Sequence, residues 1–241
     1  MALVTLSEIK DQARQRADMV NSKFFTEAEL NNYVNQSVKE LYDRLINAGE
    51  FYYMQDYTVP VLVGSDTYSL PPYFYKLLGV DLVLDSNGNA VTLRPFQFEQ
   101  RNAYLFTPTW NIVGLSYLRY MVQGDTIKFV PKPSSPQNIR IWYAPMTPKL
   151  VDTPDPYVAP AAGEAYSFQG INGWEEYVIV DMCIKMLMKE ESDPSAFMAQ
   201  KQAMIQRIEE MKVMRDIGAT GKIADVSRIM PWEFWSFNSM S

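Results

Sequence analysis

The feature that most constrains this chain is an unusually apolar stretch from Trp174 to Lys189. Its apolar residues fall on most sides of a helical wheel, and only Asp181, Lys185 and Lys189 form a narrow polar stripe, at i, i+4 and i+8. A helix of this kind has to be covered on several sides. The rest of the chain, or neighbouring copies of it, must supply the surfaces that cover it.

A second helix is predicted directly after this stretch. Asp193 is placed to accept an N–H of its first turn, Pro194 sits where its missing donor does no harm, and Gly218 is a stop. One face of this helix is apolar at helical spacing: Phe197, Met204, Ile205, Ile208 and Met211. The sequence therefore predicts a helical hairpin over residues 173–218.

Two further helices are predicted in residues 1–50. Thr5 with Glu8 forms a capping-box pattern ahead of a helix over residues 6–19, and Thr26 with Glu29 repeats the pattern ahead of a longer helix that ends at Gly49. We expect these helices and the C-terminal hairpin to form one bundle. Its predicted core residues come from both ends of the chain: Leu30, Val34, Val38, Leu41, Leu45, Trp174, Tyr177, Val178, Ile184, Leu187, Ile205 and Ile208.

Residues 51–144 change to a period of two and are rich in Tyr, Val, Ile and Thr, which predicts an inserted antiparallel β domain. Turn chemistry supports hairpins at residues 86–89 and 123–125, and residues 96–104 could form one or two helical turns. Short strands of this number suit a small sandwich or an open barrel. The expected strands are residues 58–63, 75–84, 91–93, 115–122, 126–130 and 138–143.

Residues 145–172 form a proline-rich connector with little periodicity. A structureless loop of this length is long for a compact domain, and such a segment usually lies across another surface. That surface could belong to a neighbouring subunit or to the connector's own chain. Both alternatives stay open at this point.

The segment 219–241 follows Gly218 and is predicted to be a C-terminal arm. A solvated tail should be poor in aromatics, whereas an anchor for a partner pocket should be rich in them. The arm could dock on a partner or fold back on its own bundle, and its glycines favour docking. It carries four large aromatic residues: Trp232, Phe234, Trp235 and Phe237.

The composition argues against most enzyme classes. The chain has no histidine, which removes Ser-His-Asp, Cys-His and His-based metal sites, and its single cysteine, Cys183, lies in the apolar helix and cannot form zinc ligation or a disulfide framework. Neither a phosphate-binding loop nor a dinucleotide-binding glycine motif is present. We therefore expect no catalytic residues, no cofactor and no metal. Catalysis by carboxylates alone, as in glycosidases, stays open as a minor alternative.

Charge and hydropathy further limit the kinds of protein that this chain can be. Acidic residues number 28 against 22 basic ones, a formal charge of −6, so tight binding to nucleic-acid phosphates is not expected. No apolar run reaches the length of a membrane span, and no secretory leader is recognisable. The sequence thus predicts a soluble protein of α+β class that folds in a cytoplasm.

Four blocks in succession resemble the head-to-tail adaptor (connector) proteins of short-tailed bacteriophages. They are YVNQSVKELYDRLINAG from Tyr33, TYSLPPYFYKLLGVDL from Thr67, LRPFQFEQRNAY from Leu93 and NGWEEYVIVDMCIKMLMKEESD from Asn172. The resemblance covers roughly residues 24–216. It implies a structural virion protein that forms a ring, usually of twelve copies, between the portal and the tail, and that continues the DNA channel.

The resemblance also implies partners and excludes a catalytic role. The expected partners are further copies of the chain, the portal protein and tail nozzle or tail fibre proteins, with double-stranded DNA passing through unbound and no membrane contact. The alternatives are a tail-tube or nozzle subunit and, less favoured, a carboxylate-based virion glycosidase. We further expect the C-terminal arm to dock on the portal and the β domain to face the tail.

Overall fold

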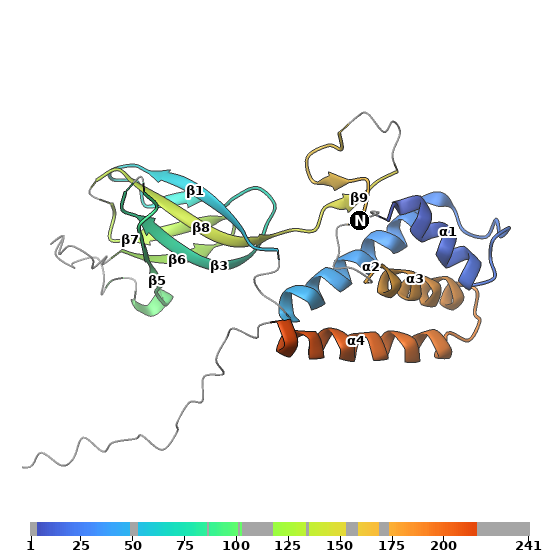
Figure 1. Cartoon of the computed structure of the whole chain (residues 1–241). Helices are drawn as coiled ribbons and strands as arrows, with labels where there is room; N and C mark the ends of the chain where they lie inside the picture. The colour runs from blue at the N-terminus through green and yellow to red at the C-terminus, as the bar shows by residue number, and fades with distance from the viewer. Residues whose placement is uncertain are drawn as a thin grey trace, which may run out of the picture.

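The computed structural model describes residues 4–48, 53–85, 87–100, 102, 118–133, 135–152, 159–168 and 174–215, with side chains up to residue 210 in the last helix. They form a helical lobe and a β lobe side by side, which confirms the predicted α+β class (Figure 1). The helical lobe combines α1 (Leu6–Arg16) and α2 (Glu27–Ala48) with α3 (Glu175–Lys189) and α4 (Ser195–Arg215).

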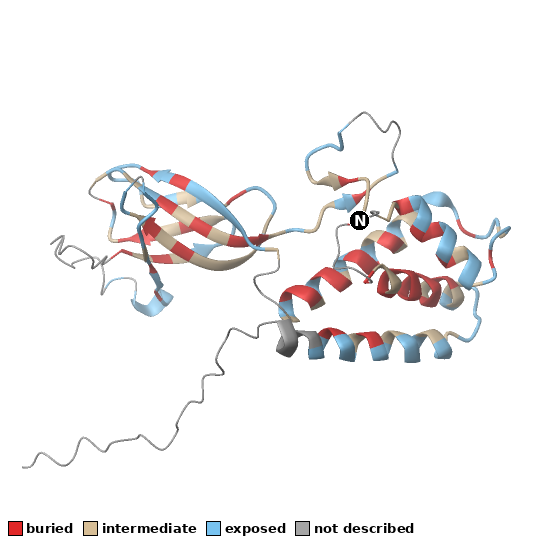
Figure 2. Ribbon diagram, viewed as in Figure 1, coloured by how far each residue is buried: buried red, intermediate tan, exposed pale blue. Residues whose placement is uncertain are grey.

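Helix α3 is the centre of the helical lobe, because it packs against α1, α2 and α4. Its residues from Tyr177 to Ile184 are all buried, which is the cover that its apolar sequence requires. The burial pattern differs sharply in α4, whose outer side is exposed along its described length (Figure 2). The helical lobe is therefore built around α3, and α4 forms one of its outer walls.

Both predicted capping boxes form. Thr26 Oγ1 accepts a hydrogen bond from Glu29 N over 3.3 Å, and Glu29 Oε2 accepts one from Thr26 N over 3.0 Å. Helix α1 is shorter than predicted and ends at Arg16 instead of residue 19. The reason is that Asp18 adopts a left-handed φ of 58°, a helix-ending conformation that a sequence without glycine at this position does not announce.

The β lobe is a sandwich of two four-stranded sheets. The first has the order β1 (Gln55–Val61), β8 (Gln137–Pro145), β3 (Phe74–Val83) and β4 (Ala90–Thr92). The second has the order β2 (Thr67–Ser69), β7 (Thr126–Val130), β6 (Arg119–Gln123) and β5 (Arg94–Pro95). Residues from both sheets share one apolar core, with Val80, Ile127, Phe129, Ile139 and Ile141 fully buried. Of the two predicted alternatives, the described strands thus form the sandwich.

The described sheets of the β lobe are antiparallel as predicted except at one edge, where β5 pairs with β6 in parallel. Neither β2 nor β5 was predicted, because strands of two or three residues are too short to show a period of two. The hairpin between β6 and β7 has the predicted turn, in which Gly124 has a φ of +57°. Within the predicted helical turns at 96–104, η1 (Phe98–Gln100) is a 3-10 turn, and residues 101 and 103–117 lie outside the described residues.

The described parts of the connector pack on the chain's own helices. Two short strands, β9 (Lys149–Leu150) and β10 (Glu164–Ala165), pair in parallel, and Leu150 and Phe168 are buried in the helical core. The Asn35 side chain of α2 bonds both backbone groups of Leu150, through Oδ1 over 2.8 Å and Nδ2 over 3.0 Å. The Asn35 amide bonds the backbone of Leu150 as a neighbouring strand would. A single side chain of this kind leaves no periodic pattern in the sequence, so this packing could not be predicted.

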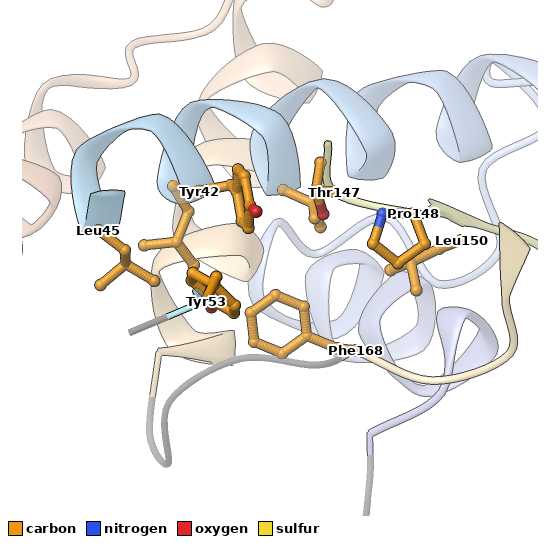
Figure 3. Close-up of a pocket in the computed structure, with 9 residues that line it drawn as sticks. Tyr42, Leu45, Tyr53, Thr147, Pro148, Leu150 and Phe168 are labelled. Atoms are coloured by element: carbon orange, nitrogen blue, oxygen red, sulfur yellow. The ribbon is translucent and has the colours of Figure 1, made fainter. Parts of the chain in front are cut away.

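Close packing between α2 and the connector is visible in Figure 3. Tyr42 and Leu45 of α2 lie against Tyr53, Pro148 and Phe168 around a void of about 10 Å³. A void of that size holds at most one water molecule. This contact is therefore part of the helical core and not a ligand site.

Candidate partner-binding surfaces

A network of charged side chains fills the seam between α2, α3 and α4. Its centre is Asp181 of α3, which is only 3% exposed. Lys201 Nζ of α4 lies 2.6 Å from Asp181 Oδ1, Lys185 Nζ lies 2.7 Å from Oδ2, and the Ser37 hydroxyl of α2 donates to Oδ2 over 2.6 Å. The predicted polar stripe of α3 is thus turned toward other helices, not toward solvent.

The network continues along α2 through Glu40. Glu40 accepts hydrogen bonds from Lys201 Nζ over 3.0 Å and from the Tyr177 hydroxyl over 2.8 Å, and Arg44 Nη2 lies 3.1 Å from its Oε1. Lys201 therefore bridges two carboxylates that belong to two different helices. Sequence analysis missed Lys201 and Glu40, because nothing in their spacing tells that α4 lies across α2.

The electrostatics of this seam favour the charged forms. Burial alone raises the pKa of the Asp181 carboxyl, but the hydrogen bonds from Lys185, Lys201 and Ser37 outweigh it and hold the pKa below its ordinary value. Burial likewise opposes ionisation of Glu40, whose pKa is nevertheless lowered by Lys201, Tyr177 and Arg44. The seam is thus a set of compensated charges that fixes α4 on the bundle.

A second polar cluster fastens the connector to α1 and α2. Lys10 Nζ, nearly buried, lies 3.0 Å from Glu27 Oε2 and 3.3 Å from Asp152 Oδ1, and Arg14 Nη2 lies 2.6 Å from Glu27 Oε1. Since Asp152 belongs to the connector, this cluster ties it down at a second point beside Leu150. These contacts hold the described parts of the connector on their own subunit.

The tip of the β lobe exposes apolar side chains at the end away from the helices. Leu62, Val63 and Leu84 are 62, 59 and 56% exposed. They directly follow Val61 and Val83, and both of those residues pair with the beginning of β8, so the three side chains lie at the same end of the sheet. Exposed apolar residues gathered at one end of a domain are typical of a protein-binding surface.

Another exposed apolar group lies at the loops between α1 and α2 and between α3 and α4. Val20 and Phe24 come from the first loop and Met188 from the last turn of α3, and all three are more than half exposed. Phe24 is held beside the end of α3, because Lys189 Nζ lies 4.8 Å from its ring centre and 2.7 Å from Glu29 Oε1. The described chain thus offers apolar contact surfaces on both lobes.

The predicted bundle-core residues all belong to the helical core. Ten of them are buried in it, while Leu187 and Ile205 are partly buried against it. The predicted arm residues Trp232, Phe234, Trp235 and Phe237 lie outside the described residues.

The described residues offer little that could act as a reaction centre. Within them, no three or more His, Cys, Asp and Glu residues gather in a way that could hold a metal ion. Cys183 is completely buried, and burial raises the pKa of its thiol to about 11, which keeps it protonated and unreactive. None of the helices among the described residues is long and apolar enough to cross a membrane.

Comparison with known protein families gives a match to the model described as SU10 adaptor protein, over residues 4–224. The match spans both lobes and the connector. The chain belongs to the SU10 adaptor protein family. The resemblance to phage head-to-tail adaptors is thereby confirmed, and the adaptor is a structural protein of a bacteriophage virion. Comparison with curated proteins found no match.

Family membership indicates what the exposed apolar groups of the adaptor can bind. An adaptor has to contact other virion proteins, and the apolar tip of the β lobe and the exposed loops of the helical lobe are surfaces suited to such contacts. The buried charges of the seam are paired with one another across α2, α3 and α4. They hold helices together.

Proposed function

We propose that this adaptor forms a ring, of twelve copies as in the family it resembles, that joins the portal to the tail and continues the DNA channel. The observation that carries the proposal is the family match across residues 4–224, which includes both lobes and all described elements. In this proposal residues 1–50 and 173–218 act as the bundle and 51–144 as the β domain. Residues 145–172 act as the connector and 219–241 as the docking arm.

The helical lobes pack side by side in the proposed ring, and the duplex passes through its centre. The formal charge of −6 supports this arrangement, because an acidic wall repels phosphates and lets DNA slide. A basic wall would instead hold the duplex through counterion release. Low affinity for DNA is thus part of the proposed function.

The β lobe faces the tail proteins in this arrangement. Its tip carries Leu62, Val63 and Leu84, which are exposed in the isolated chain and would be covered in a complex. Replacing Leu62 and Leu84 together by Ser should weaken binding of tail nozzle or tail fibre proteins. The matched control is an exposed polar residue of the same lobe, Gln55→Ser, which should leave that binding unchanged.

The C-terminal arm docks on the portal through Trp232, Phe234, Trp235 and Phe237. Large aromatic side chains supply most of the energy at protein interfaces, and four of them close together make a strong anchor. Truncation after Gly218 should therefore abolish portal binding of the folded subunit. Undiminished portal affinity of the truncated protein would show that the arm is not the portal anchor.

The ring itself is tested by the mass of the purified protein in solution, alone and after mixing with the portal of the same phage. We expect a monomer that becomes a ring of subunits on the portal, at near-physiological and at high salt. A monomer under all conditions would reject the portal adaptor and direct the search to tail-tube or nozzle assembly. Binding to tail proteins without binding to portal would favour that second role.

A further inference from the structure

A hollow of about 290 Å³ lies between the last turn of α2 and the C-terminal half of α4. It has an apolar centre made of Ala48, Ile205 and Ile208 and a polar rim made of Arg44, Asn47 and Glu209. Binding pockets for small molecules measure roughly 300–1,000 Å³. This hollow is at the lower end of that range, so it has room for one or two large side chains and not for a folded partner.

Its chemistry suits an aromatic side chain that is followed by a carboxylate. Aromatic anchors at interfaces pack into apolar pockets, and arginine at the rim commonly completes such sites. The Arg44 guanidinium carries five N–H donors. Its described bonds to Glu40 and Tyr177 use Nε and Nη2, and its side chain is 36% exposed, so it can receive a further carboxylate oxygen.

The hollow lies close to the point from which the C-terminal arm departs. Helix α4 continues to Arg215, seven residues beyond Ile208. At a rise of ~1.5 Å per residue, the end of the helix lies about 10 Å from Ile208. The first aromatic residue of the arm is Trp232, followed by Glu233. The chain thus carries an aromatic residue and an adjacent carboxylate on a tether that starts beside a matching hollow.

We propose that in the free adaptor the arm of the same subunit occupies this hollow, with an aromatic side chain of the segment Trp232–Phe237 over Ile205 and Ala48 and with Glu233 facing Arg44. The separating residues, 216–231, include Gly218 and Gly221. A random coil of that length has an end-to-end distance of roughly 22 Å, more than the ~10 Å between the end of α4 and the hollow, so the tether is long enough to reach it. A tether of this length gives an effective concentration in the millimolar range, so the subunit's own arm outcompetes the arm of another copy.

The consequence is a regulated docking step. If the arm is the portal anchor, as in the proposed function on which this part rests, the portal has to displace it from the hollow. A subunit whose arm is held in this way presents no free anchor to other subunits in solution. Assembly then begins only where the portal offers a better site for the same aromatic residues.

The contact can be trapped in the full-length monomer by a disulfide between Asn47→Cys at the rim and Ser236→Cys in the arm. The native Cys183 does not interfere, because it is completely buried and the pKa of its thiol is raised to about 11. The control pair is Gln12→Cys on the exposed side of α1 with the same arm cysteine. We expect intramolecular cross-linking of the first pair to be at least tenfold faster than that of the control pair.

Two further variants test whether the hollow itself is responsible. Ala48→Arg places a long charged side chain in the hollow, at a helix C-terminus where a cation is tolerated, and should bring the cross-linking rate down to that of the control pair. Ala203→Arg, on the exposed outer side of α4, should leave the rate unchanged. Equal rates for both cysteine pairs, or cross-linked dimers in place of monomers, would overturn the proposal.

The experiment without portal tests only the contact between arm and hollow, so it can fail while the arm still proves to be the portal anchor. Addition of the portal then tests the displacement. Cross-linking should slow at least tenfold at saturating portal. An unchanged rate, in a sample where portal binding is confirmed, would overturn the regulated step.

Discussion

The two lobes of the adaptor are held together by different kinds of interaction. The β sandwich has a core of aliphatic and aromatic residues, with Val80, Ile127, Ile139 and Ile141 fully buried, and the buried charged residues that the structure describes all lie in the other lobe. The helical lobe has an apolar core around α3 as well, but its seam with α4 contains Asp181, the bridging Lys201 and their partners. Apolar packing and strand register therefore determine the structure of the sandwich. The position of α4 is determined by paired charges.

The difference is informative because α4 is the helix from which the proposed docking arm departs. An apolar surface permits small slides of one helix on another, whereas a lysine that must satisfy Asp181 and Glu40 at once fixes both register and rotation. Buried ion pairs contribute little net stability over apolar residues, but breaking one is costly. We infer that the seam serves to place α4, which the following variants test.

The largest effect is expected from Asp181→Ala. The change leaves the ammonium groups of Lys185 and Lys201 without their common partner in a seam where water has little access. Loss of one member of a buried pair costs about 3–5 kcal/mol. Urea denaturation followed by the helical circular dichroism signal measures the loss. Glu210→Ala, on the exposed side of α4, is the control and should change the stability by less than about 0.5 kcal/mol.

A double variant sharpens the same comparison. If Asp181→Leu and Lys201→Met are combined, both members of this ion pair are removed together. Lys185 keeps its bond to Ser37, and Glu40 keeps its bonds to Tyr177 and Arg44. Part of the stability lost in Asp181→Ala should therefore return. In the double variant, α4 should nevertheless have a less fixed register and rotation on the bundle. Faster hydrogen exchange of the α4 amides would measure this. Full stability together with unchanged exchange would show that the charges are not needed to place α4.

The matching change in the β lobe is Ile141→Ala. Ile141 is fully buried between the two sheets, so the variant creates a cavity and should lose about 2–5 kcal/mol. Ile141→Val removes one methylene and should cost only about 0.5–1.5 kcal/mol. Hydrogen exchange should show that the strands lose protection first while the helices keep theirs. Equal loss in both lobes would mean that they unfold as one unit.

A change of pH should separate the lobes without mutation. The pKa values of Asp181 and Glu40 are lowered in the folded protein, so these groups stabilise it above their unfolded pKa of about 4, and the stability is lost as pH falls through the folded values. Glu29 follows the same direction, since the hydrogen bond from Lys189 lowers its pKa to about 2. The helical lobe should therefore weaken between about pH 4 and 2.

Thermal scans across that pH range, with separate probes for helices and strands, provide the measurement. The β lobe also carries a carboxylate with a lowered pKa, that of Asp85, but this residue is exposed at the tip and lies outside the apolar core, so the melting temperature of the sandwich should change less. Asp181→Asn supplies the control, because an amide cannot titrate and the variant should flatten the pH dependence of the helical lobe. A profile as steep as that of the unaltered protein would assign the dependence to other carboxylates.

Sequence analysis predicted those parts of the fold in which local chemistry decides the outcome. The stripe of α2 from Leu30 to Leu45 and the apolar wheel of α3 predict buried helices, and Gly124 marks its turn because glycine adopts a positive φ without steric cost. Contacts that depend on a side chain far away in the sequence were not predicted. Nothing local shows that Asn35 holds Leu150 or that Lys201 reaches Asp181, since each contact depends on how two elements come together.

The smallest expected effect concerns the boundary between the two lobes. The Tyr42 hydroxyl of α2 donates a hydrogen bond to the Pro145 carbonyl at the end of β8, and its ring lies 4.6 Å from that of Tyr53. Tyr42→Phe keeps the ring but leaves a partly buried carbonyl unpaired, at a cost of about 0.5–1.5 kcal/mol. Since the bond joins the lobes, the loss should show mainly as a wider separation of their two unfolding transitions.

The control for this boundary is Tyr75→Phe, because the Tyr75 hydroxyl donates to Asp43 over 2.7 Å at an exposed position of the same boundary. Water can replace that bond, so the variant should leave both transitions in place. If Tyr42→Phe also leaves them in place, the lobes are coupled by the apolar contact of Tyr42 and Ile46 with Ala144 and not by the hydrogen bond. In either case the result tells whether a partner that binds the tip of the β lobe can change the position of α4. Only lobes that are energetically coupled can transmit an effect of binding from one to the other.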